Sequence, residues 1–116
     1  MILEIEKTLI SIGNFLHNFR KENSITGYWS DSQFKTEIDN ISNSRIKNLL
    51  INIDDKIPII SEEDTSSHLK KRPNKYWLVD PLDGTRSYAE GFEGYVTQLA
   101  LVVDHFPILS GVYAPD

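Results

Sequence analysis

The stretch Trp77–Thr85 reads WLVDPLDGT and joins an apolar run to two carboxylates, Asp80 and Asp83. The apolar half is typical of a short buried strand. We expect this strand to end at Asp80 and Pro81, because the residue before a proline avoids the helical region. Both carboxylates would then lie at one edge of a sheet. A solvated turn is the alternative, since Pro-x-Asp-Gly is ordinary turn chemistry.

Two helices are predicted before this stretch. Apolar residues three and four apart over Ile2–Phe19 predict a helix that ends near position 21, and Gly27 marks the following loop. Asp31 and Ser32 can cap a second helix, whose apolar face would run over Phe34–Ile53.

Short apolar runs predict the strands of one sheet. They cover 58–60, 76–79, 95–103 and 107–113, with a turn at 104–105 and a short helix at 85–90. Residues 65–75 are polar and predict a loop that contains the basic run 70–72. The elements together predict an α/β (α+β) fold in which two helices pack on a mainly antiparallel sheet.

The amino-acid composition excludes several classes of function. The 116 residues suit one domain, and the net charge of −5 argues against binding a nucleic acid polymer. No cysteine is present, which excludes disulfides and thiolate metal sites. No apolar stretch reaches the length of a transmembrane segment, and the N-terminus does not resemble a signal peptide. We expect a cytoplasmic protein, with a peripheral position at the inner face of the membrane as the alternative.

The end of the quoted stretch has the chemistry of a cation and phosphate site. Mg²⁺ prefers oxygen ligands and keeps several waters. Asp80, Asp83 and the carbonyl of Leu82 can supply three such oxygens. Gly84 lets a phosphate approach the backbone, and the amides of Gly84 and Thr85 stand at an expected helix start.

A second acidic segment, Ser61–Asp64, follows another predicted strand. If the two strands are neighbours, Glu62 can join the same cluster of carboxylates. Taken alone, the segment is more often a solvated acidic loop. The haloacid dehalogenase motif D-x-D-G-T is excluded, since it requires an aspartate where Pro81 stands.

Three segments resemble the inositol monophosphatase superfamily, most closely the 3'(2'),5'-bisphosphate nucleotidases of the CysQ group. They are PIISEED at 58–64, YWLVDPLDGT at 76–85 and PILSGVYAPD at 107–116. The resemblance covers nearly the whole chain. It implies the N-terminal half of a layered sandwich over residues 1–116. The C-terminal α/β domain, with its further metal-binding aspartate in a W-D-x-x-A motif, would be absent.

The resemblance also implies roles for single residues. Glu62, Asp80 and Asp83, together with the carbonyl of Leu82, would bind Mg²⁺. Thr85 would hold the attacking water, supported by Asp39 in KTEID, while Gly84, Thr85 and Asp83 would meet the phosphate. An exposed position on a helix is the alternative for Asp39.

The implied activity is magnesium-dependent hydrolysis of a small phosphate ester, 3'(2')-phosphoadenosine 5'-phosphate, to AMP and phosphate. Inositol phosphate and histidinol phosphate are rival substrates, because Arg86-Ser87-Tyr88 resembles the histidinol-phosphate phosphatases. The chain is less than half the length of family members. Further possibilities are therefore an inactive remnant, one half of a split enzyme completed by a partner chain, or a homo-oligomer.

Overall fold

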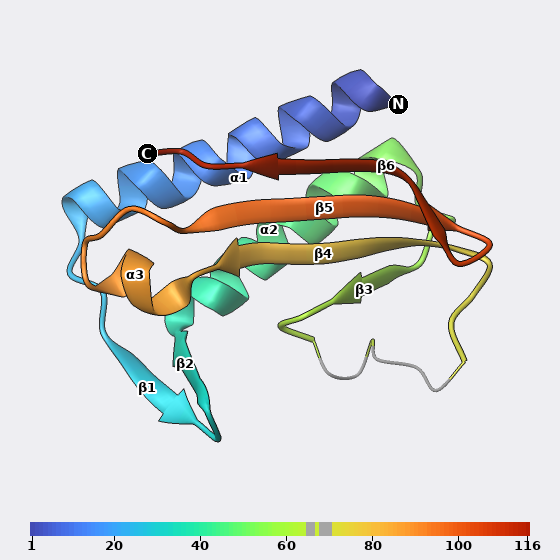
Figure 1. Cartoon of the computed structure of the whole chain (residues 1–116). Coiled ribbons are helices and arrows are strands. Elements are labelled where there is room, and N and C mark those ends of the chain that lie inside the picture. The colour runs from blue at the N-terminus through green and yellow to red at the C-terminus, as the bar shows by residue number, and fades with distance from the viewer. Residues whose placement is uncertain (65–66, 68–70) are drawn as a thin grey trace.

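The computed structural model describes residues 1–64, 67 and 71–116. These residues form helices α1 (Ile2–Glu22), α2 (Glu37–Ile53) and α3 (Thr85–Ala89). The strands are β1 (Gly27–Ser30), β2 (Gln33–Thr36), β3 (Ile59–Ser61), β4 (Lys75–Asp83), β5 (Val96–Val103) and β6 (Phe106–Tyr113). Figure 1 shows α1 and α2 on one face of a sheet, which confirms the predicted fold class.

The main sheet has the strand order β3-β4-β5-β6. Strands β4, β5 and β6 pair antiparallel, whereas β3 lies parallel to β4. The parallel pair matters for the site, because it brings the C-terminal ends of β3 and β4 to the same edge. The backbone amide of Glu62 donates to the carbonyl of Val79 at 3.1 Å and extends this alignment by one residue.

The hydrophobic core lies between the two long helices and the sheet. From α1 it takes Ile5, Leu9, Ile12 and Leu16, which confirms most of the predicted apolar stripe. Its first residue, Ile2, is exposed instead. From β4 and β5 it takes side chains that alternate along each strand: Trp77, Val79, Leu99 and Leu101. Such alternation sends the intervening side chains to the opposite face of the sheet.

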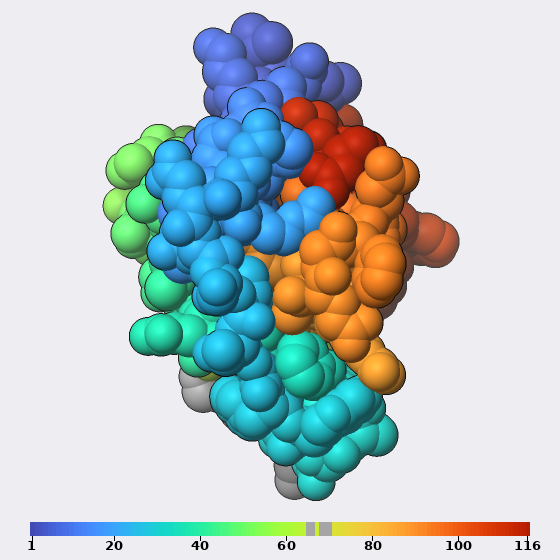
Figure 2. All heavy atoms as spheres, turned by 90° about the vertical axis from the view of Figure 1, so that its left-hand side faces the viewer, coloured from blue at the N-terminus to red at the C-terminus, as the bar shows by residue number. Residues whose placement is uncertain are grey.

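The prediction for residues 27–36 was wrong. A β-hairpin of β1 and β2 stands where a loop and a helix start were expected, and it pairs Trp29 with Phe34. Asp31 lies in its turn with φ 55°, so it does not cap a helix. Helix α2 begins at Glu37, because Thr36 and Asp39 form a capping box there. Figure 2 shows the hairpin projecting from the body of the molecule.

Strand β4 was also predicted too short. It continues through Pro81 to Asp83, and its pairing with β5 shifts by one residue between Asp80 and Asp83. A proline is tolerated at such a bulge because it has no ladder hydrogen bond to donate. The hydroxyl of Thr97 donates to the carbonyl of Pro81 at 2.9 Å, which satisfies the bulged backbone.

The sheet face opposite the helices is partly open. Leu78, Ile108 and Val112 lie on it and are 38%, 56% and 65% exposed.

No helix in the described part of the chain is long and apolar enough to cross a membrane.

Candidate active site

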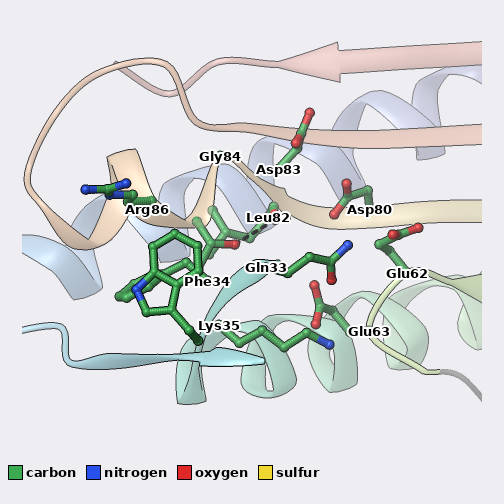
Figure 3. Close-up of a pocket in the computed structure, with 12 residues that line it drawn as sticks. Gln33, Phe34, Lys35, Glu62, Glu63, Asp80, Leu82, Asp83, Gly84 and Arg86 are labelled. Carbon is green, nitrogen blue, oxygen red and sulfur yellow. Dashed lines mark hydrogen bonds between the residues drawn. The ribbon is translucent and has the colours of Figure 1, made fainter. Parts of the chain in front are cut away.

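A cleft of about 310 Å³ opens where β3 and β4 end, under the β1–β2 hairpin. Its acidic side carries Glu62, Glu63, Asp80 and Asp83. Figure 3 shows the first three of these gathered together, with the end of Lys35 next to Glu63. The topology has therefore brought together the two acidic segments that are far apart in the sequence.

Asp39 lies at the base of this site and is 1% exposed, so the alternative of an exposed helix residue was wrong. One carboxylate oxygen accepts from the amide of Thr36 at 2.6 Å and from the Thr36 hydroxyl at 3.0 Å. The other oxygen accepts from the hydroxyl of Thr85 at 2.9 Å. Asp39, in the first turn of α2, thus links the N-cap residue Thr36 to the first residue of α3.

Asp80 is half-buried, and only part of its carboxylate is hydrogen-bonded. Its Oδ1 is buried and has no hydrogen-bond partner in the described part of the chain. Burial, followed by the charge of Asp83, raises the pKa of Asp80 to about 6. The charges of Glu62 and Asp39 push the pKa in the same direction. The site therefore carries negative charge that its own residues do not neutralise.

Glu63 is a site residue that the sequence interpretation missed, because only the first glutamate of SEED was selected. Burial, followed by the charge of Asp39, raises the pKa of Glu63 to about 7. The positive charge of Lys35, which lies on β2, opposes this rise in the pKa of Glu63. The signal was present in the sequence as two adjacent glutamates, but nothing there indicated that the first turn after β3 directs both into the cleft.

Asp83, Leu82 and Gly84 lie where the bulge of β4 leads into α3. The carboxylate of Asp83 accepts from the side-chain Nε2 of Gln98 at 2.6 Å, and the Leu82 carbonyl is 3.4 Å from the hydroxyl of Thr85. Gly84 has φ 87°, which favours glycine, and a Cβ there would lie 2.7 Å from the carbonyl oxygen of Gly94. The turn thus fixes the backbone between the last carboxylate and Thr85.

The donor set fits Mg²⁺ in chemistry and in charge. Carboxylate and carbonyl oxygens are its preferred ligands, and the orphaned oxygen of Asp80 supplies a buried donor that lacks a partner. Within the described ranges, no three acidic or histidine side chains form a ready-made metal cluster. An open arrangement of this kind is compatible with an ion that keeps several waters.

The opposite side of the cleft consists of residues that the sequence interpretation did not select. Trp29, Gln33, Phe34 and Lys35 come from the hairpin, and Arg86 comes from α3. The four hairpin residues were missed because the hairpin itself was not predicted.

The basic run at 70–72 is not part of the described cleft lining. Lys70 lies outside the described residues. Arg72 donates to the hydroxyl of Tyr76 at 3.2 Å.

Comparison with known proteins agrees with this geometry. Residues 7–115 match the model of the inositol monophosphatase family. The 3'(2'),5'-bisphosphate nucleotidase CysQ of Buchnera aphidicola is 37% identical over 101 residues, which are 86% of this chain and 38% of that protein. The CysQ of Aggregatibacter actinomycetemcomitans is 31% identical over 89% of this chain and 39% of its own length.

A solved structure shows the same fold. The extragenic suppressor protein suhB of Bartonella henselae superposes with a TM-score of 0.82 at 19% identity, over 97% of this chain and 44% of that one. The chain thus spans about two fifths of the length of the relatives it matches. Because the family model covers nearly all of its residues, the chain belongs to the inositol monophosphatase family.

Proposed function

We propose that this chain carries part of the active site of a magnesium-dependent phosphomonoesterase. Its substrate would be 3'(2')-phosphoadenosine 5'-phosphate, and its products AMP and phosphate. The observation that carries the proposal is the hydrogen bond from the Thr85 hydroxyl to buried Asp39, beside an Asp80 carboxylate with an unpartnered oxygen. The first feature can orient a water, and the second can hold a cation.

Thr85 can hold the attacking water through its oxygen. A hydroxyl has one proton to donate and two lone pairs to accept with. Since that proton points to Asp39 at 2.9 Å, the lone pairs of Oγ1 are left to accept a hydrogen bond from water. Asp39 is held in turn by Thr36, so the direction of the Thr85 hydroxyl is fixed.

Glu62, Asp80, Asp83 and the carbonyl of Leu82 would hold Mg²⁺. When bound, the ion would favour loss of a proton from water and stabilise charge on the attacking and leaving oxygens. The amides of Gly84 and Thr85 would contact the phosphate, since the first amides of a helix have no partner within it. In the reaction, the water oxygen bonds to phosphorus, the ester P–O bond breaks, and the leaving oxygen takes up a proton.

The choice of substrate is supported by the names of the two curated relatives given above, which are bisphosphate nucleotidases. Inositol phosphate and histidinol phosphate are rival substrates, and an inactive portion that needs a partner chain is the rival to activity itself. We propose a cytoplasmic location, as expected for an enzyme acting on a small nucleotide.

The test is phosphate release by the purified 116-residue chain with and without Mg²⁺. We would compare 3'-phosphoadenosine 5'-phosphate, inositol 1-phosphate and histidinol phosphate, with Glu62→Gln and Asp83→Asn as variants and circular dichroism as the check of folding. We expect magnesium-dependent turnover of the first substrate, lost in both variants. A folded chain that binds Mg²⁺ in calorimetry without turnover would contradict hydrolysis by this chain and support the inactive portion.

A further inference from the structure

An exposed aromatic side chain stands at the rim of the acidic cleft. Trp29 on β1 is 58% exposed, yet it lines the same cleft as Glu62 and Asp80. A large aromatic surface left in water loses the free energy that burial would provide. The other tryptophan of the chain, Trp77, is fully buried in the core. Burial in the core therefore does not account for the position of Trp29.

The ring of Trp29 is held on two sides. Phe34, its partner across the hairpin, meets it edge-on with ring centroids 5.3 Å apart. The guanidinium of Arg86 lies 5.5 Å from the Trp29 ring centroid and is itself paired with Glu90 at 3.1 Å. A ring supported in this way is pre-organised, so a ligand that binds to it loses little further freedom in the protein.

The chemistry of the two sides of the cleft differs. One side carries carboxylates suited to a cation and a phosphate, while the other presents an indole ring with the cations of Lys35 and Arg86 nearby. A base stacks on an aromatic ring through its flat face, whichever base it is.

We infer that Trp29 is the platform on which the planar base of a nucleotide substrate stacks, with Phe34 and Arg86 holding its ring in place. The inference rests on the proposed function, since it takes the phosphate to be at the acidic side of the cleft. It makes Trp29 a specificity-determining residue that distinguishes a nucleotide from a phosphate ester without an aromatic ring.

The experiment is calorimetric titration of the 116-residue chain in Mg²⁺ with AMP, ribose 5-phosphate, inositol 1-phosphate and inorganic phosphate. We would compare wild type with Trp29→Ala and Trp29→Phe. The matched control is Tyr28→Ala, because Tyr28 is the neighbouring exposed aromatic on β1 and is not among the residues that line this cleft. Trp29 fluorescence gives a second readout, because the only other tryptophan is buried.

We expect wild type to bind AMP more tightly than the two phosphate esters that lack a base, and AMP to quench the tryptophan emission. Trp29→Ala should weaken the binding of AMP about tenfold, which is the size of a base–aromatic stack. The affinity for ribose 5-phosphate should not change. Trp29→Phe should retain part of the affinity, and Tyr28→Ala all of it.

Two results would overturn the inference while leaving the proposed function in place. One is equal affinity for AMP and ribose 5-phosphate, and the other is an AMP affinity that Trp29→Ala does not change. A chain that binds none of the four ligands and releases no phosphate would overturn the proposed function and the inference together.

Discussion

Two carboxylates of the site, buried Asp39 and half-buried Asp80, stand in opposite situations. Asp39 accepts three hydrogen bonds from Thr36 and Thr85, so its negative charge is compensated where it lies. Asp80 has a buried oxygen with no partner in the described part of the chain. A buried polar atom without a partner lowers the stability of the fold, whereas a satisfied one does not. The hydrogen bonds of Asp39 therefore stabilise the fold, whereas the unpartnered oxygen of Asp80 destabilises it.

Asp80→Asn should stabilise the metal-free chain at pH 8. Because the folded pKa of about 6 lies above the ordinary 3.8, ionisation destabilises the folded state as the pH rises from about 4 to 6, and the loss is complete above that range. The amide removes this loss. We expect a gain of about 1 kcal/mol in the free energy of unfolding, reduced from the full linkage value because Asp80 is partly exposed to solvent.

Urea denaturation at pH 8 and at pH 4.5 measures this effect, with the exposed Asp55→Asn as the control. The gain should shrink at the lower pH, where Asp80 is protonated in the folded state. Added Mg²⁺ should stabilise wild type more than Asp80→Asn. A variant that is less stable than wild type at pH 8 without metal would contradict this account of Asp80.

Asp39→Asn should destabilise the chain by about 1–2 kcal/mol. An amide NH₂ would replace one of two oxygens that now accept from three donors, so at least one buried donor would lose its partner. Thermal or urea denaturation measures the change. Glu37→Gln is the matched control, because Glu37 lies exposed in the same first turn of α2 and also loses one charge. Equal stability of the two variants would show that the hydrogen bonds of Asp39 contribute nothing.

The sequence was informative about single residues where a short motif fixes them locally. Asp80, Leu82, Asp83 and Thr85 lie within one strand and turn, so their neighbourhood followed from their order. Glu63 and the hairpin residues could not be predicted in this way. Their place in the cleft depends on the parallel pairing of β3 with β4 and on a hairpin that belongs to neither.

At the scale of elements, the turn from β4 to α3 decides whether the site residues of these two elements meet. Gly84 provides that turn with φ 87°, and it lies so close to Gly94 that an added Cβ would contact the Gly94 carbonyl at 2.7 Å. Gly91 has a similar φ of 83°, but an added Cβ there would meet nothing within 4 Å. Comparing substitutions at the two glycines therefore separates the cost of backbone strain from the cost of a close contact.

Gly84→Ala should therefore cost more than Gly91→Ala. Both variants should lose about 1 kcal/mol from the left-handed backbone, and Gly84→Ala should lose about 1–2 kcal/mol more because the carbonyl of Gly94 has to move. Chemical denaturation gives both values. The hydrogen bond from Thr85 to Asp39 should weaken in Gly84→Ala alone, visible as a shift of the Thr85 resonances in NMR. Equal losses in the two variants would mean that the close approach to Gly94 has no energetic role.

The start of α2 shows why element boundaries were harder to predict than elements. Asp31 and Ser32 are good capping residues, and so is Thr36. The structure uses Thr36, because Asp39 completes a capping box there and residues 27–36 pair as a hairpin instead. Local capping preference could not choose between the two positions. The choice depends on Trp29 and Phe34 meeting across the hairpin and on Asp39 being buried against Thr85.

At the scale of the whole molecule, the sheet has one face covered by α1 and α2 and one face partly open. The open face carries Leu78, Ile108 and Val112, all of which are exposed in the described structure. Exposed apolar side chains on one face of a sheet are typical of interaction sites. The relatives are more than twice as long as this chain, so their additional residues are available to cover such a face.

The chain on its own should therefore self-associate through this face. We expect a weight-average mass that rises above 13.3 kDa with concentration in light scattering or sedimentation. The double variant Ile108→Lys/Val112→Lys should remain near the mass of one chain, because two charges on the face oppose its burial. Ile51→Lys is the control, since Ile51 is an exposed apolar residue on α2. A monomeric wild type at every concentration, or an equal effect of Ile51→Lys, would contradict association through the open face of the sheet.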